Sequence, residues 1–208
     1  MRVWLSLILL SVAAPAFAQQ TDRIPPFVID ARGAYVRLTE DATTAKALGV
    51  TVEDLATRGL GLVGGVHLYP FRRGVFALGM GGELLLARAK RQNFDEATGD
   101  PLGPEVRRQF QSLSFQLSFN FGHRQGWSYL TAGVGPLGFD TYLADTLPDG
   151  ARPMTTNFGF GARWFNTDHV AFSLDLRFYS TQPADATLVV GARERSNVMV
   201  FSAGISLK

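Results

Sequence analysis

The sequence predicts an all-β fold, an eight-stranded antiparallel up-and-down transmembrane β-barrel that follows an N-terminal signal peptide. Three observations predict it. Apolar and polar side chains alternate with a period of two along eight segments, which is the pattern of strands with two different faces. The connections between these segments alternate strictly between short and long. None of the three lysines lies in the middle of a segment, although a strand face in water would carry several.

The first element is a signal peptide over residues 1–18. Arg2 gives a positive start, and an apolar run from residue 3 to residue 12 follows it. Ala16 and Ala18 flank Phe17 in the small-x-small pattern of a cleavage site, so we expect the mature chain to begin at Gln19. The apolar run is shorter than the roughly 20 residues that a transmembrane helix needs. The remaining residues, 19–208, form the predicted barrel domain.

The composition limits the functions that the chain can have. A length of 208 residues suits one domain, and the absence of cysteine excludes disulfide frameworks and cysteine-ligated metals. The 20 Lys and Arg nearly balance the 18 Asp and Glu, which does not favour a nucleic-acid partner. The 22 glycines and 16 phenylalanines suit strands with close-packed interiors and apolar outer faces.

The clearest strand runs from Ser112 to Phe121. Phe115 and Phe119 lie on one face of it, whereas Gln116 lies on the other, and a helix would not produce this pattern. Seven further segments show the same alternation, namely 27–38, 59–70, 75–89, 127–136, 154–165, 169–180 and 196–207. Each segment is long enough for a tilted strand of about 9–11 residues to cross a bilayer.

The connections predict the topology. Residues 70–74, 122–126 and 166–168 form short connections, and residues 39–58, 90–108, 138–153 and 181–195 form long polar ones. Barrels of this kind have short periplasmic turns and longer extracellular loops, so three turns and four loops place both ends of the barrel on the periplasmic side. In the first loop, Thr51 and the acids that follow it are expected to cap a short helix.

Aromatic residues gather at the strand ends beside the short connections. Rings with a polar edge favour the headgroup level of a membrane, so these residues predict a periplasmic aromatic girdle. The girdle comprises Phe27, Tyr69, Phe121, Trp127 and Trp164.

Alternation alone does not decide which face contacts lipid. A soluble lipocalin-like barrel would turn its apolar faces inward. The interior of eight strands is just wide enough for side chains to fill, and these faces carry too much Phe and Leu for that space. We therefore expect the apolar faces to contact lipid and the polar faces to line the lumen.

The polar faces then place a set of charges in the lumen. The predicted network comprises Asp30, Arg32, His67, Glu83, Arg163, Asp175 and Arg177. Buried charges are costly unless they are paired and hydrogen-bonded. Three acids against three arginines therefore predict a closed, neutral lumen, in which glycines on the same faces leave room for the long side chains.

Motifs for chemistry are weak. Two G-x-G-x-x-G matches, at 59–64 and 133–138, lack the strand-turn-helix setting of a nucleotide site and fit strand glycines better. His67, His123 and His169 are about fifty residues apart without metal-ligand spacing. An acyltransferring site near the outer leaflet would need a His with a Ser and a carboxylate, but all three His belong to the periplasmic half. We predict no catalytic, cofactor or metal residues.

Arginines in the long connections allow two interpretations. They can meet the phosphates of lipopolysaccharide, where bidentate guanidinium contacts are effective, or they can be ordinary solvated loop charges. The residues concerned are Arg88, Arg91, Arg107, Arg108, Arg193 and Arg195.

The signal site, the eight alternating strands and the last strand at 196–207 resemble the small outer-membrane β-barrels of the OmpA, OmpX and OmpW type, over essentially the whole mature chain. This resemblance implies a location in the outer membrane, contact with its lipid and lipopolysaccharide, and insertion by the outer-membrane assembly machinery after escort by periplasmic chaperones. We expect a monomer.

Three functions stay open. The preferred one is a structural or surface-interaction barrel with a closed lumen and four long extracellular loops. The second is a narrow channel for small molecules, with an apolar entry formed by Phe139, Leu143, Leu188, Val189 and Val190. The third is an enzyme that modifies the acyl chains of lipid A.

Overall fold

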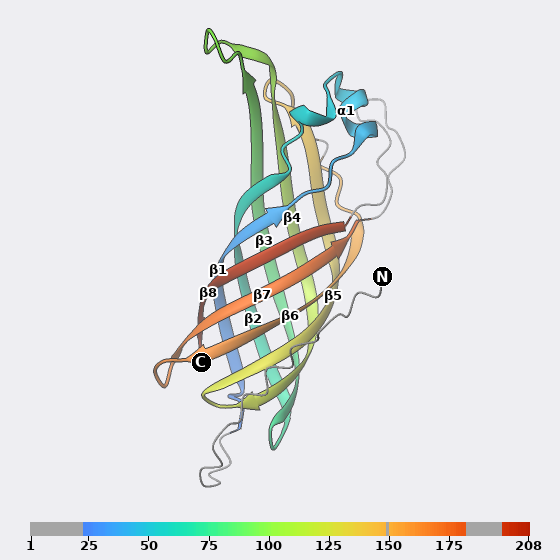
Figure 1. Cartoon of the computed structure of the whole chain (residues 1–208). Helices are drawn as coiled ribbons and strands as arrows, with labels where there is room; N and C mark the ends of the chain where they lie inside the picture. The colour runs from blue at the N-terminus through green and yellow to red at the C-terminus, as the bar shows by residue number, and fades with distance from the viewer. Residues whose placement is uncertain (1–22, 149, 182–196) are drawn as a thin grey trace, which may run out of the picture.

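The computed structural model describes residues 23–148, 150–181 and 197–208, and they form a closed antiparallel barrel of eight strands (Figure 1). Each strand pairs with its neighbours in sequence, and β1 pairs with β8 to close the ring. The strands are β1 (Phe27–Arg37), β2 (Arg58–Arg73), β3 (Phe76–Phe94), β4 (Pro101–His123), β5 (Gly126–Leu143), β6 (Met154–Phe165), β7 (Val170–Ser180) and β8 (Asn197–Leu207). The predicted fold class is confirmed. The signal peptide, with Ala16, Ala18 and Gln19, lies outside the described residues.

The apolar faces of the strands point outward. Along β1 the side chains alternate strictly between exposed and buried, because successive Cβ atoms of a strand point to opposite faces. Leu60 and Leu62 on the outer face of β2 are 73% and 70% exposed, whereas Asp30 on the inner face of β1 is 2% exposed. This arrangement is the reverse of a lipocalin-like barrel. Within the described ranges, no helix is long and apolar enough to cross a membrane.

The two ends of the barrel differ. The strands are joined by short turns at one end, which we call the turn end, and by longer connections at the other, which we call the loop end. At the loop end β3 and β4 extend as a paired hairpin well above their neighbours (Figure 1). Lys90 pairs with Arg107 in this extension, and the connection itself is only 95–100.

The expectation of long loops at 90–108 and 138–153 is therefore partly wrong, since β5 also continues to Leu143. A strand that leaves the membrane meets water on its outer face and loses the apolar-polar alternation, although its backbone groups are still satisfied by the ladder. Sequence pattern alone does not separate such a strand from a loop. The predicted loop 181–195 lies, apart from Thr181, outside the described residues.

The connection between β1 and β2 contains two short helices, α1 (Ala42–Leu48) and η1 (Val52–Asp54). The Asp41 side chain caps α1 by accepting from the backbone N–H groups of Thr43, at 2.9 Å, and Thr44, at 3.3 Å. The sequence analysis missed α1. It placed the cap of the second helix correctly at Thr51.

That second cap is a capping box, in which Thr51 faces the backbone N–H of Asp54 and the Asp54 side chain in turn accepts from Thr51. The Thr51 hydroxyl and backbone N–H both donate to the Asp54 carboxylate, each at 2.8 Å. A carboxylate has two acceptor oxygens, and the Asn93 side chain of β3 donates to the other one. These hydrogen bonds, led by the Thr51 hydroxyl, lower the pKa of Asp54.

The barrel interior is divided into three layers, which the inward residues of β1 cross in order. Val28 belongs to an apolar layer at the turn end, Asp30 and Arg32 to a charged layer in the middle, and Ala34 and Val36 to an apolar layer at the loop end. The turn-end layer contains Ile24, Val28, Tyr69, Ala77, Trp127 and Tyr129. The loop-end layer contains Ala34, Val36, Leu38, Ala56, Val63, Leu85, Ala87, Ala89, Phe110, Leu137, Phe139, Tyr179, Val198 and Val200. The expected polar lumen therefore has apolar groups at both ends, although single buried polar side chains such as Asn120 and Ser112 lie at the same levels.

Candidate functional site

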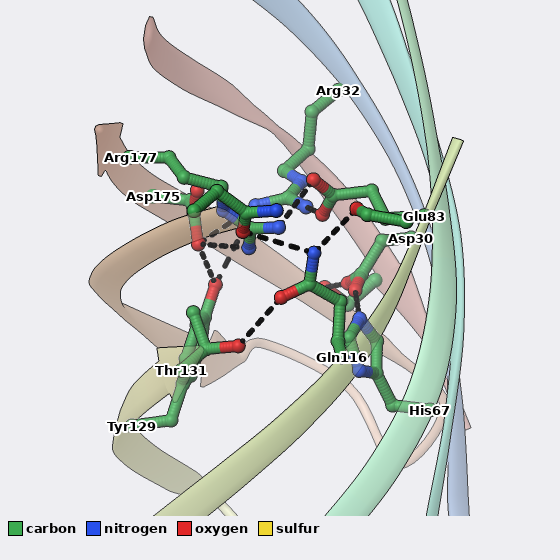
Figure 2. A network of polar contacts seen from close by, with 12 residues as sticks. Asp30, Arg32, His67, Glu83, Gln116, Tyr129, Thr131, Asp175 and Arg177 are labelled. Atoms are coloured by element: carbon green, nitrogen blue, oxygen red, sulfur yellow. Dashed lines mark hydrogen bonds and ion pairs between the residues drawn. The ribbon is translucent and has the colours of Figure 1, made fainter. Parts of the chain in front are cut away.

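The charged layer brings together all seven predicted lumen residues, which come from five strands. Figure 2 labels all of them except Arg163. Each is at most 4% exposed. β1 supplies Asp30 and Arg32, β2 His67, β3 Glu83, β6 Arg163, and β7 Asp175 and Arg177.

Glycines on the neighbouring strands make room for these side chains. The register places Gly65 of β2 between Asp30 on one side and Glu83 on the other. Gly161 of β6 pairs with Asp175, and Gly159 pairs with Arg177. A Cβ at Gly161 would overlap the Tyr129 hydroxyl and a backbone carbonyl of β7, so this position requires a glycine while the network is in place.

Four of the charges form a closed ring of ion pairs across the lumen (Figure 2). Arg32 contacts Glu83, with 2.6 Å between Nη2 and Oε2, and Asp175, with 3.3 Å between Nη1 and Oδ2. Arg177 contacts the same two acids, with 3.1 Å between Nη2 and the Asp175 Oδ2 and with the Glu83 Oε1 as its other partner. Each arginine therefore joins both acids, and β1, β3 and β7 are tied together through the interior.

The remaining three residues, two charges and a histidine, form a second group beside the ring. Arg163 donates two hydrogen bonds to Asp30, with 2.6 Å between Nη2 and Oδ2 and 3.1 Å between Nε and Oδ1. Such a bidentate pair is among the stronger polar contacts in proteins. The Ser206 hydroxyl also donates to Asp30, and the His67 Nε2 lies 3.4 Å from its Oδ2. The Arg163 guanidinium carbon is 4.3 Å from the centre of the Tyr129 ring, within the range of a cation–π contact.

Neutral side chains complete the layer. The sequence analysis placed Gln116 on a polar, lumen-facing strand face but included none of them in the predicted network. The Tyr129 hydroxyl donates to Asp175 at 2.9 Å. Gln116 of β4 donates to Ser114 at 2.6 Å and to Asn157 at 3.1 Å, and it accepts from Thr131 at 3.0 Å. The signal that would have found them is their strand phase, because all of them lie on inward positions.

The predicted aromatic girdle divides into two sets. Phe27, Phe121 and Trp164 face outward at the turn end and are 42%, 40% and 49% exposed. Tyr69 and Trp127 are only 2% and 3% exposed, so their assignment to the girdle is wrong.

Strand phase explains this correction. Tyr69 lies two residues after the inward His67, and Trp127 lies two residues before the inward Tyr129. Their rings meet edge to face inside the turn-end layer, with 6.1 Å between centroids. Position along a strand predicts the depth of a residue in the membrane, but only the phase predicts its side of the wall.

The other candidate residues do not assemble into a site. His123 and His169 lie at the turn end, away from the charged layer that holds His67. Phe139, expected at a channel entry, is 7% exposed and belongs to the loop-end apolar layer. Leu188, Val189 and Val190 lie outside the described residues. Across the described part of the chain, no three His, Cys, Asp or Glu side chains are grouped so that they could hold a metal ion.

Comparisons with known proteins support the fold. No protein-family model matches the chain, and no curated protein matches it. Among solved structures, the outer membrane protein OprG from Pseudomonas aeruginosa is similar with a TM-score of 0.53 and 14% identity, over 89% of this chain and 96% of that one. Neisserial surface protein A has a TM-score of 0.47 and 12% identity, over 88% and 97%. The Ail protein of Yersinia pestis has a TM-score of 0.46 and 13% identity, over 87% and 96%. The likeness to OprG shows that the chain has the fold of small outer-membrane β-barrels, and the resemblance noted in the sequence is confirmed at that level.

Proposed function

We propose that this chain is an outer-membrane β-barrel of structural or surface-interaction type. Its lumen is closed, and the surface that meets other molecules is at its loop end. The observation that carries the proposal is the ring of Arg32, Glu83, Arg177 and Asp175 across the interior. The continuous apolar outer face and the alternation of turns and longer connections support the membrane location. They support placing the turn end in the periplasm and the loop end outside the cell.

The ring closes the lumen because a permeating ion would have to break it. Separating either arginine from its acids would leave buried charges uncompensated, which typically costs about 3–5 kcal/mol for each broken pair. The ring holds two positive and two negative groups, so it offers no net charge to draw in ions of one sign.

The apolar layers above and below oppose hydrated ions for a different reason. In the loop-end layer, the Phe110 ring packs edge to face against Phe139, at 5.8 Å between centroids, and against Tyr179, at 5.3 Å. A narrow apolar constriction excludes water, and an ion cannot pass without a hydration shell or a substitute for it. The same packing argues against the narrow-channel alternative.

The geometry around the lumen histidine does not favour an enzyme. Acyl transfer by a serine needs the serine hydroxyl to donate to the histidine. Here the Ser206 hydroxyl donates to Asp30, which also contacts His67, and all three lie in the closed interior away from lipid. A non-enzymatic role is therefore the better proposal.

The test is single-channel recording of the purified mature barrel in planar bilayers. We expect no steady conductance from a protein whose folded state is verified by its shift in gel mobility on heating. The matched control is a variant that weakens two layers at once, Glu83→Ala with Phe110→Ala, in which we expect brief conducting events. Large, stable conductance steps from the unaltered protein would refute the closed lumen.

A further inference from the structure

The two ends of the barrel differ in charge as well as in the length of their connections. Each described loop-end connection carries acids, such as Asp41, Asp95 and Asp145. At the turn end, Asp168 is the single carboxylate among the described side chains. The described turn-end cations are Arg23 before β1, Arg72 and Arg73 at the end of β2, Arg124 between β4 and β5, and Lys208 after β8. The turn end therefore carries an excess of positive charge, which raises the local concentration of anions.

Arg72 extends over the opening of the barrel at the turn end, which we call the mouth. It pairs with Ala77, whose side chain belongs to the turn-end apolar layer, so Arg72 lies on the inward phase of β2. Its Nη1 donates to the main-chain oxygen of Ile24, at 3.2 Å. The Ile24 side chain is buried in the same apolar layer. The guanidinium group is therefore held at the mouth, beside the residue that fills it.

Lys208 also extends over the mouth. It follows β8, yet its Nζ donates to the main-chain oxygen of Arg124, at 2.8 Å, in the turn between β4 and β5. In a closed ring of eight strands, β4 and β8 lie on opposite sides. The same ammonium group lies 3.7 Å from the centre of the Phe165 ring, which stacks on Trp127 of the turn-end layer. Two cations that come from different strands therefore lie over one apolar layer.

These two cations are suited to carboxylate ligands. In the contacts just described, Arg72 and Lys208 donate to main-chain carbonyls, which are neutral. A carboxylate is a stronger acceptor from a cation than a carbonyl, because it carries a full charge. Among the described residues, Arg23 and Arg72 have no carboxylate within ion-pair distance.

We propose that the mouth is a second interaction surface, which docks an acidic peptide segment of a periplasmic protein. Carboxylates of the peptide would contact Arg72 and Lys208 over the mouth, and Arg23 and Arg124 at its rim. An extended peptide presents side chains of one face about 7 Å apart, so a single segment can contact cations from several turns. Lipid headgroups fit the mouth less well, because they contact the outer face of the barrel and the turns enclose the mouth.

The chain offers a matched control at the next residue. Arg73 has the same charge as Arg72 and lies at the same end of β2. It pairs with Phe76 on the outward phase, and it lines a surface cleft with Phe71 and Phe119. Arg73 therefore lies where lipid can reach it, whereas Arg72 lies over the mouth.

The test measures peptide binding to the folded barrel in a zwitterionic detergent. Fluorescence anisotropy follows the titration of a labelled oligoglutamate peptide, and an oligoglutamine peptide of the same length shows what is bound without charge. The variants are Arg72→Gln, Arg72→Gln/Lys208→Gln, Arg23→Gln and the control Arg73→Gln. Arg23→Gln leaves the contacts of Ile24 and Lys208 in place. Native mass spectrometry compares phosphatidylglycerol with phosphatidylcholine on the same proteins, and heat-shifted gel mobility shows that each is folded.

We expect oligoglutamate to bind the unaltered protein more tightly than oligoglutamine, and added salt to weaken it. Arg72→Gln/Lys208→Gln should weaken oligoglutamate binding at least about fivefold, since one exposed ion pair is worth up to about 1 kcal/mol and 1.4 kcal/mol is tenfold. Arg72→Gln and Arg23→Gln should each weaken it less, and Arg73→Gln should weaken it least. Equal binding of the two peptides, or an equal loss in Arg73→Gln and Arg72→Gln, would overturn the proposal. A loss of phosphatidylglycerol preference in Arg72→Gln/Lys208→Gln, with peptide binding unchanged, would assign the mouth to lipid instead.

The inference rests on the proposed periplasmic placement of the turn end, and it is independent of the closed lumen. That placement has its own measurement, because the chain contains no cysteine of its own. Asp168→Cys should react with an impermeant maleimide only after the outer membrane is opened. Labelling of intact cells would refute the orientation of the barrel, and with it a periplasmic partner, whatever the peptide titration shows. A barrel that conducts ions and still binds oligoglutamate through Arg72 would refute only the closed lumen.

Discussion

The charged layer and the loop-end apolar layer meet on β3, where Glu83 and Leu85 are consecutive inward residues. Both are buried, at 3% and 1% exposure. Glu83 is held by two arginines from β1 and β7, whereas Leu85 packs within the loop-end apolar layer. The first kind of contact needs particular partners at particular distances, and the second needs only apolar volume. The interior is thus closed in one layer by ion pairs and in the next layer by apolar packing.

The largest effect is expected from breaking the ring. Glu83→Ala leaves Arg32 and Arg177 without one of their two acids, so the free energy of unfolding should fall by about 3–5 kcal/mol. Urea titration in detergent, followed by heat-shifted gel mobility, measures the change. The control is Glu105→Ala, which removes a partly exposed ion pair and should cost less than about 1 kcal/mol. If the two variants lost the same free energy of unfolding, the ion pairs of the ring would stabilise the fold no more than an exposed ion pair does.

The apolar layer should respond to lost volume. Leu85→Ala is expected to cost about 2–5 kcal/mol in the same titration, because the barrel wall cannot collapse into the cavity. A pair of shape-preserving changes sharpens the comparison.

In that pair, Leu85→Met should cost less than about 1.5 kcal/mol because volume is kept. Glu83→Gln should lower the free energy of unfolding nearly as much as Glu83→Ala does, because an amide cannot neutralise two guanidinium groups. A Glu83→Gln variant as stable as Leu85→Met would mean that both layers work by filling alone.

The charged layer also depends on the glycines beside it. Gly161→Ala should destabilise the barrel by about 1–3 kcal/mol, because the added methyl group overlaps the Tyr129 hydroxyl that donates to Asp175. Gly82→Ala adds the same methyl group on the outer face of β3, where nothing lies within 4 Å. We expect little change there. Similar losses at the two positions would point to backbone entropy rather than to the crowded interior.

The smallest effect is expected outside the membrane, in the capped turn at Asp54. Its pKa is lowered by the Thr51 and Asn93 donors. A lowered folded-state pKa stabilises the turn above the unfolded value of about 3.9, and this contribution is lost as pH falls through the folded pKa. The protection of the Thr51 amide against exchange, relative to its intrinsic rate at each pH, should therefore be high at neutral pH and fall at strongly acidic pH. Asp54→Asn should remove the pH dependence, and its persistence would assign it to another group.

The alternation of apolar and polar residues predicts much of the fold, but at particular residues the prediction fails. The period of two identified eight strands and the seven inward residues of the lumen network, because a strand fixes the side of each residue relative to its neighbours. Tyr69 and Trp127 were misassigned because their position at strand ends was weighed above their phase. The hairpin beyond Arg88 was taken for loop because its outer face is polar, although Ala89 and Val106 on its inner face are buried.

The sequence by itself determined which side chains share the interior. Each of Asp30, Arg32, Glu83, Asp175 and Arg177 lies on the phase opposite to the apolar face of its own strand, and this is a local property. Their partners were decided only by the tertiary structure. Arg163 and Asp30 are 133 residues apart, and Arg32 and Glu83 are 51 apart. No local pattern relates residues at such separations, because closure of the barrel and the register of every strand pair between them set which charges meet.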